Sequence, residues 1–180
     1  MIMTQAIQII AIPVLIGILL FLLPSALRLV KAFITIAVVL FTGYLAISLF
    51  GSEDLVFSPD YWANAEKYCS FSLDGLSKLI LLFMSLRSLL VAVYSVSYKT
   101  SASMRNFYAW FLITLGFSYG AVLANNLLLF LICWGILGIS LYRLIDGKDQ
   151  KSSAAAKKAL VLIGASDGIM ILGIAILWRV

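Results

Sequence analysis

Six long apolar runs, separated by short polar connections, make up most of the chain. A helix crosses about 30 Å of hydrocarbon with roughly 20 mostly apolar residues, and each run is long enough to do so. The pattern therefore predicts an all-α polytopic membrane protein with about six transmembrane helices in a single membrane domain, residues 1–180. The predicted spans are about 6–23, 29–50, 73–97, 107–124, 127–145 and 159–178.

The composition agrees with this pattern, since 63% of the 180 residues are hydrophobic, 12% are charged and the mean hydropathy is +1.10. Soluble globular domains contain roughly 45–50% apolar and about 25% charged residues, so an ordinary soluble domain is excluded. No basic residue precedes the first apolar run, and no small-x-small cleavage site follows it. We therefore expect this run to be kept as the first span and not removed as a secretory signal.

The net charge of +5 is explained by membrane topology. The basic residues do not cluster on one face, so we expect no nucleic-acid partner. They gather in the first, third and fifth connections, and basic loops stay on the cytoplasmic side of a membrane. We therefore expect both termini and the loop 51–72 to lie outside. The membrane itself is expected to be a bacterial or archaeal cytoplasmic membrane. The basic residues concerned are Arg28, Lys31, Lys99, Arg105, Arg143, Lys148, Lys151, Lys157 and Lys158.

The longest connection, residues 51–72, combines acidic and aromatic residues. Interleaved aromatic residues are typical of a membrane–water interface, and a short amphipathic segment on the membrane surface fits this composition. Its acidic residues are Glu53, Asp54, Asp60 and Glu66, and its aromatic residues include Phe57, Tyr61, Trp62 and Tyr68.

A metal centre ligated by this chain is not expected, because the chain has no histidine and only two cysteines. Cys69 lies in the polar connection and Cys133 lies in an apolar run. Their different depths argue against a disulfide bond between them.

Two charged residues stand at the start of the third predicted span, where Lys78 follows Asp74 by one helical turn. A charge at the bilayer centre costs roughly 2.5–3.5 kcal/mol on insertion scales, so charged side chains inside spans usually have partners. The structural interpretation is a same-face ion pair near the outer interface. The functional alternative is the mouth of an ion path.

Arg87 and Asp167 lie deeper in their spans. At about 1.5 Å per residue, both are roughly 12–15 Å above the cytoplasmic boundary, and this equal depth makes them candidate partners. One interpretation is a neutral salt bridge that holds two helices together. The other is a proton-relay carboxylate that is tuned by the arginine.

Small residues recur at helical spacing in the fourth and fifth spans. Gly116, Gly120 and Ala124 are four residues apart, and Gly135 and Gly138 follow on the next span. Such faces let helices approach each other closely, so we expect them to serve packing.

Four segments from the third span onward follow, in order, the pattern of a known family. They contain FSLDGLS at 71–77 and YSVSY at 94–98, LANNLLLF at 123–130, CWGILGISLY at 133–142, and AAAKKA at 154–159 with Asp167-Gly168. The segments resemble the antiporter-like membrane subunits that are shared by respiratory complex I, group 4 membrane-bound hydrogenases (including formate hydrogenlyase types) and Mrp antiporters. The resemblance covers about residues 71–178, and it implies the N-terminal part, helices one to six, of such a subunit.

The chain also departs from the pattern of that family. Where the resemblance implies a glutamate on the fifth helix, central to a proton path, this chain has Gly135. Lys78 and Arg87 stand at positions that are apolar in the family. Lys158 precedes Asp167 by nine residues, as the family pattern has it, and both are candidate ion-path residues. The resemblance also implies later helices with a functional lysine, which lie beyond the sixth span.

Three functional interpretations follow. In the first, the chain is a truncated or split antiporter-like subunit that contributes to proton or sodium translocation when its complement docks, and Asp167, Lys158 and Arg87 keep it open. In the second, the chain is a pump-inactive scaffold that seals a larger membrane arm against lipid, and Gly135 favours it. The third, an autonomous small transporter or membrane enzyme, requires a complete central site that these six spans do not provide.

The resemblance also sets the expectations for cofactors and partners. We expect no catalytic centre and no cofactor in this chain. Any nickel-iron, iron–sulfur, flavin or quinone site would belong to partner subunits of a larger membrane complex. Redox-driven and gradient-driven complexes stay open as alternatives.

Overall fold

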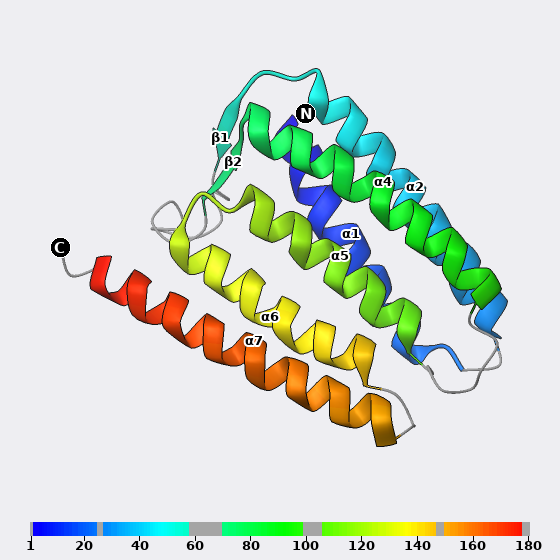
Figure 1. The fold of residues 1–180 in the computed structure, drawn as a ribbon. Helices are drawn as coiled ribbons and strands as arrows, with labels where there is room; N and C mark the ends of the chain where they lie inside the picture. The colour runs from blue at the N-terminus through cyan, green and yellow to red at the C-terminus, as the bar shows by residue number, and fades with distance from the viewer. Residues whose placement is uncertain (1, 25–26, 58–69, 99–105, 147–149, 178–180) are drawn as a thin grey trace.

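The computed structural model describes residues 2–24, 27–57, 70–98, 106–146 and 150–177. Six antiparallel helices dominate it (Figure 1), which confirms the predicted all-α membrane fold. Five of them are long and apolar enough to cross a membrane, and the sixth, Phe107–Leu123, is a shorter apolar helix. The helices are α1 (Ile2–Leu22), α2 (Arg28–Phe50), α4 (Gly75–Tyr98), α5 (Phe107–Leu123), α6 (Leu127–Ile145) and α7 (Gln150–Leu177).

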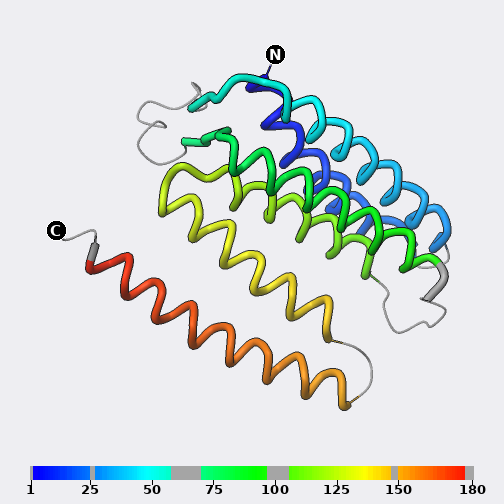
Figure 2. Tube along the Cα trace, turned by 45° about the horizontal axis from the view of Figure 1, so that its top comes forward, coloured from blue at the N-terminus to red at the C-terminus, as the bar shows by residue number. Residues whose placement is uncertain are grey.

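The helices are arranged around α5. Helix α1 packs along α5, α2 packs along α4, and α6 lies between α5 and α7. Helix α7 therefore forms one edge of the bundle (Figures 1 and 2). Within the described residues, none of the most apolar stretch of α7 is buried, whereas α2 has the largest buried share of the candidate spans.

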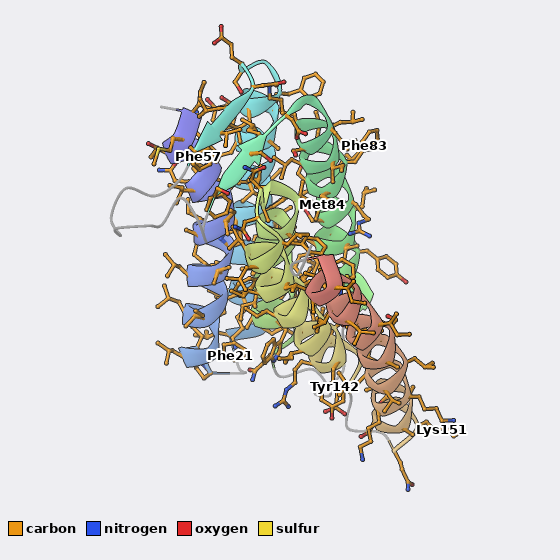
Figure 3. The ribbon with its side chains drawn as sticks, turned by 90° about the vertical axis from the view of Figure 1, so that its left-hand side faces the viewer. Phe21, Phe57, Phe83, Met84, Tyr142 and Lys151 are labelled. Atoms are coloured by element: carbon orange, nitrogen blue, oxygen red, sulfur yellow. The ribbon has the colours of Figure 1, made fainter. Side chains whose placement is uncertain are left out.

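The boundary of the last helix differs from its prediction. The apolar pattern places the start of the sixth span near residue 159, but α7 begins at Gln150. Alanines 154–156 and the lysines 157–158 favour helix strongly, so the helix continues beyond the apolar run. At 28 residues it is about 42 Å long and exceeds the hydrocarbon thickness of about 30 Å. Figure 3 shows Lys151 at the end of the bundle opposite Phe57.

Two short strands in the long connection were not predicted. Strand β1 (Leu55–Phe57) pairs antiparallel with β2 (Phe71–Leu73), and the ring of Phe57 stacks on that of Phe71 with centroids 5.6 Å apart. Strands of three residues carry too few positions for an alternating pattern to be recognised. An amphipathic segment is predicted in the connection 51–72, and residues 58–69 of it, which include Cys69, lie outside the described residues.

The strand pair is fixed to the end of α5. Phe71 forms an isolated antiparallel bridge with Ala124, and the backbone N–H of Asn125 donates to the Ser70 carbonyl oxygen at 2.9 Å. The side chain of Asn126 then accepts from the backbone N–H of Leu128 at 2.8 Å and caps the start of α6. These bonds place the strands and the α5–α6 turn at the same end of the bundle.

Glycines bring α1 and α5 into close contact. A Cβ atom on Gly116 would lie 2.9 Å from the Ile10 carbonyl oxygen and 3.2 Å from the Val14 nitrogen, and one on Gly17 would lie 3.0 Å from the Ala109 carbonyl oxygen. Only glycine permits such backbone separation. The predicted packing role of Gly116 is therefore confirmed.

Candidate functional site

Asp74 lies directly before α4 and caps it. Its Oδ1 accepts hydrogen bonds from the Ser77 hydroxyl and from the Ser77 backbone N–H, the latter at 3.1 Å. These bonds, the hydroxyl bond most strongly, hold the pKa of the Asp74 carboxyl below its ordinary value of 3.8. Asp74 is thus an N-cap, and its negative charge also suits the helix N-terminus.

Lys78 does not form the ion pair with Asp74 that their spacing suggests. Its Nζ lies 2.7 Å from Asp54 Oδ1 and donates to the Ser52 carbonyl oxygen at 2.5 Å. The Lys78 side chain is only 6% exposed, whereas that of Asp54 is 70% exposed. Lys78 therefore fastens the segment after α2 to the first turn of α4. Sequence reasoning missed Asp54 as the partner, because a carboxylate one turn away seemed to satisfy the lysine.

Buried hydroxyl groups line the contact between α2 and α4. Thr42 on α2 and Ser85, Ser88 and Ser95 on α4 are all buried. Each hydroxyl donates to a carbonyl oxygen three residues back in its own helix, at 2.7–3.0 Å. Because these hydroxyl groups donate within their own helices, they do not link α2 to α4, and their small side chains let the two helices pack closely.

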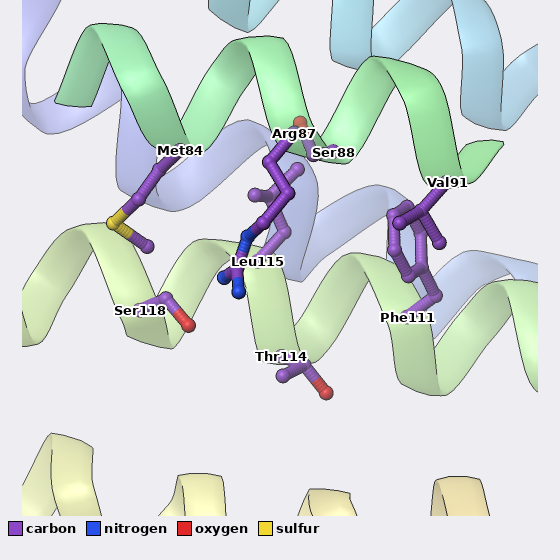
Figure 4. Close-up of a pocket in the computed structure, with 8 residues that line it drawn as sticks. All are labelled: Met84, Arg87, Ser88, Val91, Phe111, Thr114, Leu115 and Ser118. Carbon is purple, nitrogen blue, oxygen red and sulfur yellow. The ribbon is translucent and has the colours of Figure 1, made fainter. Parts of the chain in front are cut away.

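Arg87 lies at the middle of α4, beside a cavity of about 130 Å³ between α4 and α5. Its side chain extends from α4 toward Thr114 and Ser118 on α5 (Figure 4). In the part of the chain that the structure describes, no hydrogen bond or ion pair engages its guanidinium group. We call this cavity the α4–α5 groove; the residues that line it include Met84, Arg87, Val91, Phe111, Thr114 and Ser118.

Asp167 lies on the α6 side of α7. Its Oδ1 accepts a hydrogen bond from Trp134 Nε1 at 2.8 Å. Its other carboxylate oxygen lies beside Gly138 and would be 3.8 Å from a Cβ atom there, which is an ordinary van der Waals contact. The sequence predicted Asp167 as a candidate, but Trp134 appeared only within the segment 133–142, and the hydrogen bond between the two was not predicted.

The structure does not bring the remaining candidates to Asp167. Arg87 and Asp167 form no ion pair within the described residues, because they lie on α4 and α7 and contact different neighbours. Nine residues turn an α-helix by two and a half turns, so Lys158 projects from the opposite side of α7. Gly135 is exposed, and a Cβ atom there would meet no atom of the described residues within 4 Å.

The comparisons with known proteins concern these same helices. Residues 124–180, which contain α6 and α7, match the family "NADH:quinone oxidoreductase/Mrp antiporter, TM". The "Na(+)/H(+) antiporter subunit A1" of Staphylococcus haemolyticus (strain JCSC1435) is 32% identical over 146 residues, which are 77% of this chain. The chain belongs to the antiporter-like subunit family. This confirms the resemblance seen in its sequence.

A second curated relative and two solved structures agree. The protein of the same description from Staphylococcus aureus (strain JH9) is 32% identical over 124 residues, 67% of this chain. A chain of the Mrp complex from Dietzia sp. DQ12-45-1b matches the fold with a TM-score of 0.82 at 22% identity. A chain of the archaeal membrane-bound sulfane sulfur reductase matches with a TM-score of 0.81 at 18% identity.

This antiporter-like chain corresponds to one portion of its relatives. It covers 97% of its own length in both structural matches, but only 34% of the Mrp chain and 37% of the reductase chain. It spans 18% and 15% of the two curated relatives. Most of the length of each relative therefore lies outside the region that matches this chain.

Proposed function

We propose that this chain is the portion with helices one to six of an antiporter-like subunit in the membrane arm of an ion-translocating complex. The curated relatives are described as subunits of Na(+)/H(+) antiporters, and both structural matches come from multi-subunit membrane complexes. The observation that carries the proposal is the carboxylate of Asp167, which lies inside the membrane span α7. Helices α6 and α7 have the smallest buried shares of the candidate spans.

Asp167 is the residue that we propose to carry the ion. A carboxylate within a span is costly and is usually retained for an ion path or a specific partner. The Trp134 indole, which donates to one carboxylate oxygen, holds the side chain against α6. The other oxygen, beside Gly138, is left to take up and release a proton or to bind a sodium ion. Further helices of the subunit would complete the path on the open side of α7.

The second candidate function is a scaffold without ion transfer. The observation that favours it is Gly135, which has no side chain at the position where the resemblance implies a glutamate. In that case Asp167 and Trp134 only fasten α7 to α6, and the chain shields the remaining membrane arm from lipid.

Asp167→Asn separates the two functions, since asparagine keeps an oxygen that can accept from Trp134 but cannot carry a proton at neutral pH. For a translocating subunit, we expect normal assembly of the complex with loss of ion movement in inverted membrane vesicles. For a scaffold, ion movement stays normal. Asp146→Asn is the matched control, because Asp146 lies at the C-terminal end of α6 and should not affect either readout.

The orientation and the partners are part of the same proposal. We infer that the ends of the bundle rich in lysine and arginine face the cytoplasm of a bacterial or archaeal cell, and that any redox centre is held by partner subunits. In spheroplasts, a membrane-impermeant maleimide should label a cysteine at Glu53 and spare one at Lys151, in a chain that lacks Cys69 and Cys133. The reverse labelling would contradict this orientation.

A further inference from the structure

The α4–α5 groove is the second place in the molecule where a charge lies deep in a span. Arg87 follows Gly75 by twelve residues and precedes Tyr98 by eleven. At about 1.5 Å per residue, it lies about 18 Å from one end of α4 and about 16 Å from the other. In a hydrocarbon layer of about 30 Å, this is close to the bilayer midplane.

The chain itself offers little to this guanidinium group. An arginine has five N–H donors and requires acceptors, above all a carboxylate whose two oxygens match its planar fork. Within the described residues, the other polar side chains that line the groove belong to Ser88, Thr114 and Ser118, and none of them accepts a hydrogen bond from Arg87. The Thr114 hydroxyl instead donates to the Trp110 carbonyl oxygen at 2.7 Å.

The depth of Arg87 decides which acidic group can reach it. Lipid phosphates lie at the membrane boundary, about 15 Å from the midplane, so they cannot pair with Arg87 without a long excursion of its side chain. A carboxylate on another transmembrane helix can lie at the same depth. Charge complementarity therefore favours a protein partner over a lipid.

The cavity of about 130 Å³ is much smaller than a helix, but it can receive a side chain of a helix that packs over α4 and α5. Helices α4 and α5 contact each other much less than α2 contacts α4 or α1 contacts α5. The groove also has apolar lining residues that can pack against a helix, namely Met84, Val91 and Phe111.

We propose that the α4–α5 groove docks a transmembrane helix of another subunit, which presents an aspartate or glutamate to Arg87 near the bilayer midplane. This inference rests on the proposed function, because it requires a multi-subunit membrane complex. The groove is separate from the α6–α7 side of the bundle, where Asp167 lies. It is therefore a second contact with the rest of the complex.

Photocrosslinking in the native membrane tests the proposal. The photoreactive residue p-benzoylphenylalanine replaces Ser118 in the groove or, as a control, the exposed Phe33 on α2. After irradiation, we expect the Ser118 variant to crosslink to a membrane helix of a different subunit that contains an Asp or Glu, with at least a tenfold lower yield at Phe33. Crosslinks to lipid alone, to a second copy of this chain, or to a helix without an acidic residue would overturn the proposal.

Charge reversal adds the specific test of Arg87. We expect Arg87→Glu to reduce the yield of the Ser118 crosslink at least tenfold. Replacing the partner's acidic residue by Lys or Arg, in the complex that contains Arg87→Glu, should restore the yield. If Arg87→Glu lowers the amount of folded chain, Arg87→Gln gives the readout instead, with an intermediate loss expected. An unchanged yield in the folded variant contradicts the proposal.

The two proposals fail in distinguishable ways. If the tagged chain leaves the membrane as a monomer without companion subunits, the proposed function fails and the docking proposal fails with it. If the complex stays intact but Ser118 crosslinks only to lipid, the docking proposal alone fails.

Discussion

Glycines have different surroundings in the half of the bundle with α1 and α5 and in the half with α6 and α7. Between α1 and α5, a Cβ atom on Gly17 or Gly116 would press against backbone atoms of the facing helix. On α6 and α7, a Cβ atom would meet no atom within 4 Å at Gly135, Gly164 or Gly168. The first group is explained by contacts within the chain, whereas the second group is not.

This difference shows which surfaces the chain satisfies by itself. The half with α1, α2, α4 and α5 contains nearly all of the buried hydrophobic cluster. Among the described elements, α6 is the main neighbour of α7, yet α7 is part of the family match and has a carboxylate within its span. Small residues in membrane helices allow close approach of other helices, so the glycines of α6 and α7 fit a face that further helices cover.

The largest effect is expected for Gly116→Val. Its added side chain meets the Ile10 and Val14 backbone, which cannot move without separating α1 from α5. We expect the free energy of unfolding to fall by about 3 kcal/mol, at the upper end of overpacking costs. Titration with SDS in detergent micelles measures it. Gly135→Val is the matched control, and an equal loss for both variants would remove the distinction between the two halves.

The next largest effect is expected for Asp54→Asn, which removes the charged partner of the buried Lys78 ammonium group and keeps the Ser52 carbonyl oxygen as an acceptor. Loss of a charged partner should cost about 1.5 kcal/mol. Lys78→Met should cost less, because it removes the buried charge and keeps the length of the side chain. The same titration compares the two, and a larger loss for Lys78→Met would show that Asp54 is not the important partner.

A smaller effect is expected for Asp74→Ala, which removes the cap of α4 and should cost about 1 kcal/mol at pH 7. Because folding lowers the pKa of Asp74, its contribution is complete above the ordinary value of 3.8 and is lost as the pH falls below it. The difference between wild type and Asp74→Ala should therefore narrow at pH 3. Melting curves at both pH values measure it, and a constant difference would argue against a charged cap.

The smallest effect on the chain itself is expected for Gly164→Leu on the open side of α7. Because no atom of the described residues lies within 4 Å of a Cβ atom at Gly164, the free energy of unfolding should change by no more than about 0.5 kcal/mol. Assembly with companion subunits, measured by the yield of tagged complex, should nevertheless fall. Normal assembly would indicate that this side of α7 faces lipid.

The fold was largely predictable because each span is a long apolar run, and that signal needs no knowledge of tertiary contacts. The same runs gave the depth of Arg87 and Asp167, but depth along the membrane normal does not fix the direction in which a side chain points. Equal depth therefore suggested a pair that the structure does not form. The partners of Lys78 and Asp167 come from 24 and 33 residues away, where local spacing carries no signal.

The central claim is that further helices of an ion-translocating complex cover the side of α7 that this chain leaves open. A cryo-EM map of the complex, purified from its native membrane through a tag on this chain, tests it most directly. The account predicts transmembrane helices from outside residues 1–180 packed against α7, close to Asp167 and Gly164. A map in which α7 borders only lipid, or a chain that purifies as a monomer, would contradict it.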